Sequence, residues 1–217
     1  SGKADYIMTL DADEVFAPYI DKKPDIYSTV QELPQLETDF ISVKTVVHLH
    51  EYDRIQFYKD GLGWEWHQPV HEYCWSPNSK SGSRLEDACV LPLTGGARSG
   101  DSDKYEKDAE LLEAYTLNNP HDSRGWFYLA QSYRDGGALE NSLNALEEVL
   151  KCSASDEEIY ETLFRKATVL EQTKGMEVAV YVYLQAYSKR PTRAEPLFRL
   201  LQYYRTVGAY PLATLFG

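Results

Sequence analysis

The spacing of hydrophobic residues changes from strand-like to helix-like along this chain. Short apolar runs at residues 6–10, 40–49 and 54–58 are typical of strands, and the first predicts a buried strand that ends at Asp11. From about residue 103 onwards, apolar residues recur every three or four positions, which predicts amphipathic helices. The two halves of the chain therefore predict two different kinds of structure.

The helical half contains an internal repeat. Residues 126–138 match residues 197–209 at an offset of 71 positions, and a weaker copy at residues 163–170 is followed by Gly175. This offset is about twice the roughly 34-residue period of tetratricopeptide repeats. Each copy predicts a helix pair joined at a glycine turn, and stacking such pairs buries apolar faces that no pair can bury alone.

Small residues at 94–100 mark the boundary between the two halves. We therefore expect one domain over residues 1–97 and a second domain of helical repeats over residues 98–217. In the first domain, a short helix is expected between residues 24 and 36. In the second, Asp122 or Ser123 is placed to cap the helix that holds the first repeat copy.

Charge limits the ligands that the protein can bind. The chain has 22 Lys and Arg against 34 Asp and Glu, a net charge of -12, which argues against general binding to nucleic acid. An anionic ligand such as a nucleotide sugar would need a divalent cation between itself and the protein.

No apolar run approaches the roughly 20 residues that span a bilayer, and no signal peptide opens the sequence, so a cytoplasmic location is expected.

Two carboxylates at the end of the first predicted strand form the first candidate site. Asp11 and Asp13 leave the strand at positions i and i+2, from which both can meet one cation. Mn²⁺ and Mg²⁺ prefer hard oxygen ligands of this kind, usually together with substrate phosphates. The alternative is an acidic turn without a ligand, because aspartate favours turns in any protein.

A second candidate site lies in the segment from residue 64 to residue 73. His71 and Glu72 place a possible metal ligand beside a possible general base, although both can serve one site only if the chain turns there. Trp64 and Trp66 share a face of an extended chain and could stack against a sugar. Ordinary core packing explains the aromatic residues and the histidine equally well.

Five stretches together resemble family-2 glycosyltransferases that carry C-terminal tetratricopeptide repeats. They are YIMTLDADEVF, RIQFYKDGLGWEWHQPVHEY, GGARSGDSDKYEKDAELLE, NNPHDSRGWFYLAQSYRDGG and YLQAYSKRPTRAEPLFRLLQYYRTVGAYPLA. The resemblance implies the C-terminal half of an α/β catalytic domain of the GT-A fold, followed by an all-α domain of TPR-like repeats. The half that binds the nucleotide base would precede Asp11 and is missing, so we expect this fragment to be inactive alone.

The resemblance also implies roles for the candidate residues. Asp11 and Asp13 would bind the donor, Asp13 and His71 would hold Mn²⁺ or Mg²⁺, and Glu72 would be the base of an inverting transfer from a nucleotide sugar. Trp64 and Trp66 would bind the saccharide or peptide acceptor. Two alternatives remain open: a module whose repeats bind a protein partner beside a catalytically incomplete remnant, and a metal-dependent hydrolase that uses the same acidic pair.

Overall fold

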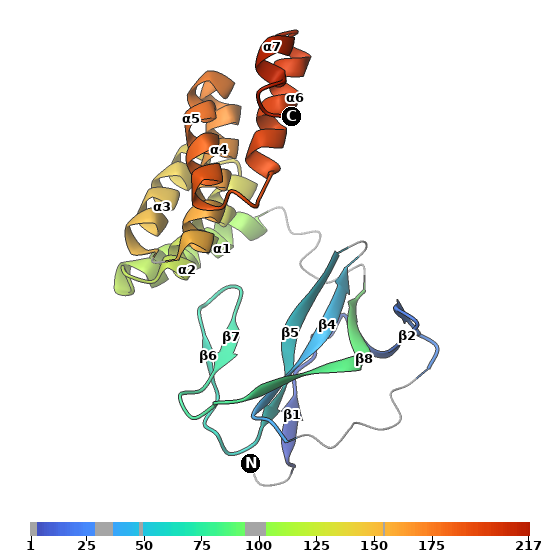
Figure 1. The fold of residues 1–217 in the computed structure, drawn as a ribbon. Coiled ribbons are helices and arrows are strands. Elements are labelled where there is room, and N and C mark those ends of the chain that lie inside the picture. The colour runs from blue at the N-terminus through green and yellow to red at the C-terminus, as the bar shows by residue number, and fades with distance from the viewer. Residues whose placement is uncertain (1–3, 29–36, 48–49, 94–102, 154) are drawn as a thin grey trace. The chain divides into compact units, whose positions relative to one another are not determined.

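The chain divides into two compact units (Figure 1). The computed structural model describes residues 4–28, 37–47, 50–93, 103–153 and 155–217. The first unit comprises Ser1–His67 and Glu72–Asp101, and the second comprises Gln68–His71 and Ser102–Gly217. The boundary expected at residues 94–100 and most of the short helix expected between residues 24 and 36 lie outside the described residues.

The first unit is built on a six-stranded sheet with the spatial order β1-β5-β4-β8-β2-β3. Its strands are β1 (Tyr6–Met8), β2 (Glu14–Ile20), β3 (Lys23–Pro24), β4 (Phe40–Val47), β5 (His50–Lys59) and β8 (Gly82–Pro92). Neighbouring strands are antiparallel, except that β4 and β8 are parallel. A separate hairpin pairs β6 (Glu65–His67) with β7 (Tyr73–Trp75).

Alternating side chains give the sheet one apolar face and one polar face. In β4, Ile41 and Val43 are almost fully buried, whereas the intervening Ser42 is half-buried. This period-2 pattern is what an antiparallel sheet with a single covered face requires. On the polar face, Lys44 of β4 forms an ion pair with Glu51 of β5, with 2.7 Å between Nζ and Oε2.

Two expectations for the first unit are wrong. Strand β1 lies at the edge of the sheet with Ile7 50% exposed, so the first apolar run is not a buried strand. The expected α/β GT-A domain is also absent, because the described part of this unit contains strands and no helix. The alternation in β4 accounts for the difference, because helix-covered parallel strands have near-continuous apolar runs.

The second unit is a series of packed helices. They are α1 (Lys104–Asn118), α2 (Ser123–Asp135), α3 (Leu139–Cys152), α4 (Asp156–Lys174), α5 (Met176–Lys189), α6 (Glu195–Thr206) and α7 (Tyr210–Ala213). Helix α1 packs on α2, and α2 with α3, α4 with α5, and α6 with α7 form successive pairs. Among the described helices, none is long and apolar enough to cross a membrane.

Glycines with a positive φ angle join each helix pair. Gly137, Gly175 and Gly208 have φ angles of 83°, 86° and 75°, in the left-handed region that glycine adopts without steric penalty. Gly137 and Gly208 lie at the ends of their repeat copies and Gly175 follows the weaker copy, so each turn lies where the repeat predicts it. Asp122 caps α2 by accepting a hydrogen bond from the Arg124 backbone N–H, as the sequence also suggests.

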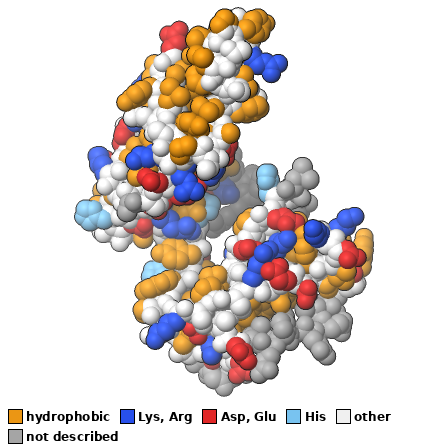
Figure 2. All heavy atoms as spheres, in the orientation of Figure 1, with side chains coloured by type: hydrophobic (Ala, Val, Ile, Leu, Met, Phe, Trp, Pro, Cys, Tyr) orange, Lys and Arg blue, Asp and Glu red, His pale blue; other side chains and the backbone are white. Residues whose placement is uncertain are grey.

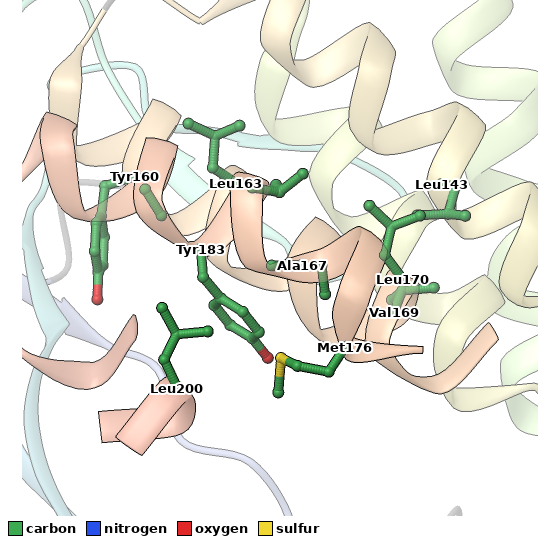
Figure 3. Close-up of a cluster of buried hydrophobic side chains, with 12 residues drawn as sticks. Leu143, Tyr160, Leu163, Ala167, Val169, Leu170, Met176, Tyr183 and Leu200 are labelled. Atoms are coloured by element: carbon green, nitrogen blue, oxygen red, sulfur yellow. The ribbon is translucent and has the colours of Figure 1, made fainter. Parts of the chain in front are cut away.

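The largest core of the second unit lies where α4, α5 and α6 meet (Figure 3). Tyr183 of α5 is fully buried between Ala167 of α4 and Leu200 of α6. Its hydroxyl donates to Glu171 of α4 at 2.8 Å, so the buried phenol does not lack a hydrogen-bond partner.

Candidate functional site

The acidic turn after β1 is held by an arginine of β5. Glu14, whose side chain is 4% exposed, accepts a hydrogen bond from Arg54 Nη2 at 2.6 Å, and Asp11 Oδ2 lies 3.8 Å from Arg54 Nη1. The Asp11 N–H donates to the Glu14 side chain and the Glu14 N–H donates to the Asp11 carbonyl. Arg54 therefore places a positive charge beside Asp11, one of the two carboxylates for which the sequence predicts a shared metal ion.

Asp13 lies in the same turn and is exposed. Its carbonyl accepts a hydrogen bond from the Leu93 N–H at 2.6 Å, which ties the turn to the end of β8. Within the described residues, no three His, Cys, Asp or Glu side chains form a group that could hold a metal ion. Asp13 belongs to the first unit and His71 to the second, so binding of Mn²⁺ or Mg²⁺ by this pair has no support here and stays a prediction.

The two tryptophans of the predicted acceptor site have different environments. Trp64 is partly buried, with its ring edge-on to Tyr58 at 5.1 Å and its Nε1–H bonded to the Lys59 carbonyl. Trp66 is 54% exposed and lies 6.4 Å from the same Tyr58 ring. Trp64 thus has a structural role in the first unit, whereas Trp66 remains accessible to a ligand.

Three further aromatic side chains gather on the β6–β7 hairpin. His67 stacks on Tyr73 at 5.3 Å and meets the edge of Trp75 at 5.8 Å. His67 is paired with Tyr73 across the hairpin, and side chains of paired residues lie on the same face. Glu72, the predicted base, is exposed, and within the described part of the chain its carboxylate makes no hydrogen bond or ion pair.

A set of polar contacts from α2 and its N-cap holds the segment Gln68–His71 in the second unit. Arg124 of α2 donates from Nε to the Gln68 side-chain oxygen at 3.0 Å and from Nη2 to the His71 carbonyl at 3.1 Å. The Gln68 side-chain nitrogen donates to Asp122 at 3.0 Å, so both ends of its buried amide are satisfied. Sequence reasoning missed Gln68 and Arg124, because no local pattern links positions 56 residues apart.

Apolar and aromatic contacts complete this arrangement. Val70 is 9% exposed and belongs to the core cluster that includes Leu112 of α1 and Leu129 of α2. The His71 ring stacks on Tyr128 with 4.1 Å between ring centroids, and the Arg124 guanidinium lies 4.7 Å from the same ring. His71 was expected to bind a metal ion, but its ring is instead packed against an aromatic side chain.

The packing changes the acidity of two groups. Loss of hydration lowers the pKa of His71, the charge of Asp108 opposes this, and the charges of Arg124 and Lys104 add to it. Burial alone would raise the pKa of Asp122, but hydrogen bonds from Gln68, Tyr115 and the α2 backbone hold that pKa below its ordinary value. At neutral pH the arrangement therefore combines a neutral imidazole with a charged carboxylate.

A groove lies beside this segment, between α2 and α4. Its lining includes Phe127, Tyr128, Val149, Glu157, Glu158 and Glu161. Arg193 pairs with Glu157 and Glu161, at 2.8 Å and 3.1 Å. In the described chain no Lys or Arg lies within ion-pair distance of the Glu158 carboxylate. That carboxylate accepts one long hydrogen bond, from the Ser123 hydroxyl. The groove combines aromatic rings with a carboxylate that is open to a ligand.

A second exposed surface lies over α6 and α7. Figure 2 shows hydrophobic side chains gathered at this end of the helical unit. Those more than half exposed are Phe198, Val207, Tyr210 and Leu215. An apolar surface of this kind is often covered by another chain, but no contact of the described residues shows what would cover it.

Comparisons with known proteins give no family for this chain. No protein-family model and no curated protein matches the sequence. Similar solved structures include a MamA double mutant (RS-1 ArsTM), which is 16% identical over 52% of this chain and 61% of that chain, with a TM-score of 0.44. The C-terminal part of a TPR repeat-containing protein from Cytophaga hutchinsonii is 14% identical over 52% of this chain and 44% of that chain, also with a TM-score of 0.44.

A third similar structure is MamA MSR-1 C2, which is 15% identical over 56% of this chain and 76% of that chain, with a TM-score of 0.43. The chain spans less than two thirds of the length of the first two structures. These are MamA and TPR-repeat structures and not glycosyltransferases.

The resemblance to family-2 glycosyltransferases is wrong: no protein-family model matches the sequence, and the described part of the first unit is a sheet of strands and not the expected α/β GT-A domain. The enzyme class, the inverting transfer and the nucleotide-sugar donor depended on that resemblance and are withdrawn with it. The motif at Asp11 and Asp13 misled because aspartates are common in turns whatever the function, and here the turn is stabilised by Arg54. The roles of Glu72 as a base and of Trp64 and Trp66 in acceptor binding are tested by nothing in the structure and stay predictions.

Proposed function

We propose that this chain is a protein-interaction module whose helical unit binds an extended segment of a partner protein. The observation that supports this most directly is the groove between α2 and α4, where Phe127 and Tyr128 line a hollow bordered by glutamates. Arrays of helix pairs present extended surfaces that suit peptides. Aromatic residues are enriched at such interfaces because they bury a large area with few rotatable bonds.

The charges at the groove indicate the chemistry of the partner. Glu157 and Glu161 are already paired with Arg193, so they contribute little net attraction for a ligand. Glu158 is exposed and has no cationic partner in the described residues. A partner segment with an apolar side chain against Phe127 and a Lys or Arg beside Glu158 would complement both features.

A peptide-selection experiment tests this function. Random peptides displayed on phage would be selected on the intact chain and on a variant with Phe127→Ala and Glu158→Lys. The wild-type chain should enrich peptides that combine apolar and basic residues, and the double variant should lose at least tenfold in affinity for them. Glu110→Lys, an exposed charge reversal on α1, is the matched control and should bind the same peptides as the wild type.

Two results would contradict the proposal. If no peptide family is enriched by the folded wild-type chain, the helical unit is not a module for extended segments. If the enriched peptides bind the groove variant and the wild type equally well, their site lies elsewhere.

A further inference from the structure

The face formed by α1 and α2 has the properties of a second binding site, which shares Arg124 and Tyr128 with the lining of the groove. Arg124 bonds to two different positions of the segment Gln68–His71, one a side chain and one a backbone carbonyl. Asp122 accepts from the other end of the Gln68 amide. Recognition of a buried amide at both ends is specific, because a residue without that amide would leave buried polar groups unsatisfied.

Two further contacts define the chemistry that this face accepts. Val70 is buried in the same core cluster as Leu112 of α1 and Leu129 of α2, an apolar environment that suits a branched apolar side chain. His71 lies flat on Tyr128 at an interplanar angle of 20°. The segment thus presents, in order, an amide, a proline, a branched apolar residue and a flat ring.

The resident segment adopts an unfavourable backbone. Gln68 and His71 have φ angles of 69° and 55°, in the left-handed region that residues other than glycine rarely occupy. Such conformations persist where surrounding contacts impose them. A peptide that makes the same contacts would bind in this same turned conformation.

We propose that the α1–α2 face is a peptide-recognition site that this chain fills with its own Gln68–His71 segment, and that a partner segment with the pattern Gln-Pro-Val-His can occupy it instead. The ligand is a peptide with a glutamine amide, a branched apolar side chain two residues later and a planar ring after it. This site shares Arg124 and Tyr128 with the groove between α2 and α4 but does not include Phe127 or Glu158, so substitutions at Phe127 and Glu158 distinguish the two proposals.

The test removes the side chains with which the resident segment fills the site, and adds the same segment as a separate peptide. The chain with these substitutions is called the opened chain. The intact chain would carry Gln68→Gly, Val70→Gly and His71→Gly, and its binding to a fluorescent peptide of residues 64–73 would be followed by anisotropy. The opened chain should bind this peptide at least tenfold more tightly than the wild type, whose site is filled. The same peptide with Gln68→Ala and Val70→Asp should bind at least tenfold more weakly.

Arginine variants locate the bound peptide. In the opened chain, Arg124→Ala should reduce affinity at least tenfold, whereas Arg199→Ala on α6 should leave it unchanged. Glu158→Lys should also have no effect, which separates this site from the groove. Circular dichroism melting would confirm that each variant is folded. If the triple variant is unfolded, Gln68→Ala alone releases the segment from Arg124 and Asp122 and serves as the opened chain.

Several outcomes would overturn the proposal. These are equal binding of the peptide to wild-type and opened chains, no saturable binding to a folded opened chain, and binding that Arg124→Ala does not weaken. Exchange of the segment between two copies, detected as a stable dimer of the opened chain that excludes the peptide, would also overturn it.

Discussion

At the scale of single residues, the imidazole of His71 gives the helical unit a defined response to pH. Its folded-state pKa is lowered by lost hydration and by the charges of Arg124 and Lys104. The unfolded imidazole titrates near 6.5. Below that pH the unfolded state binds more protons than the folded state, so the free energy of unfolding falls until the folded pKa is passed.

We therefore expect His71→Phe to flatten the dependence of stability on pH just below 6.5. Phenylalanine keeps the stacking on Tyr128 and cannot be protonated. Thermal melting of the wild type and the variant between pH 5 and pH 8 measures the effect. His121→Gln removes an exposed histidine and is the control. If His71→Phe keeps the wild-type dependence of stability on pH, His71 is not the cause of that dependence.

The carboxylate of Asp122 gives a second dependence of stability on pH, at lower pH values. Its folded pKa is depressed, so its contribution to stability is present above the ordinary carboxyl pKa of 3.8 and is lost as pH falls through the folded value. Asp122→Asn keeps a side chain that can cap α2. However, the Gln68 amide and the Tyr115 hydroxyl would then face an amide N–H or a neutral oxygen in place of the carboxylate.

The Asp122→Asn variant should accordingly be less stable than the wild type at pH 7, by an amount that shrinks as the pH approaches 2. Urea unfolding at several pH values measures this difference. A destabilisation of the same size at both ends of the pH range would mean that only the cap, and not the charge, is affected.

The sequence shows which residues are polar but not which of them meet. Asp122 was predicted as a cap because a cap is a local signal, within three residues of its partner N–H. Arg54 and Glu14 are 40 residues apart, and Gln68 and Arg124 are 56 apart. Such pairs depend on the fold and cannot be read from the sequence. The sequence therefore led to a predicted metal ion at Asp11 and Asp13, whereas the structure places an arginine close to Asp11 and Glu14.

At the scale of elements, the helix pairs depend on their glycine turns. Gly175 has φ 86° and ψ 166°, a combination that is essentially restricted to glycine. Gly137 and Gly208 also have positive φ angles. The turn between α4 and α5 is therefore the one least able to accept a side chain.

Gly175→Ala should lower the free energy of unfolding by about 1–3 kcal/mol, the usual cost of a residue held in a disfavoured backbone region. No atom of the described residues lies within 4 Å of the position of the added methyl group, so the effect would come from backbone strain and not from a steric clash. Urea denaturation measures it, with Gln172→Ala on the exposed side of α4 as the control. Unchanged stability would show that the turn relaxes to another conformation.

Helices were more predictable than the sheet for a physical reason. A helix is set by residues three and four apart, so the periodic pattern after residue 103 and the caps locate it. The sheet depends on partners distant in sequence: β4 lies between β5, which follows it directly, and β8, about 40 residues later. The strand expected at residues 40–49 is observed as β4 over Phe40–Val47, but the edge position of β1 and the parallel pairing of β4 with β8 were not predicted.

At the scale of the whole molecule, each unit has its own core. Ile41, Val43 and Phe57 belong to a cluster within the sheet, while Leu146 of α3 belongs to a cluster of the helical unit. Units with separate cores can open with different free energies, and then no single free energy of unfolding describes the chain.

Core substitutions should therefore act on one unit at a time. Leu146→Ala removes a side chain that is 1% exposed and should destabilise the helical unit by about 2–5 kcal/mol, and Ile41→Ala should do the same for the sheet unit. Hydrogen exchange followed by mass spectrometry should show faster exchange in α2 and α3 for the first variant and in β4 and β5 for the second. Leu111→Ala, at a position 51% exposed, should change neither. Faster exchange in both units after either core substitution would mean that the chain unfolds as one cooperative structure, and that the two cores are thermodynamically coupled.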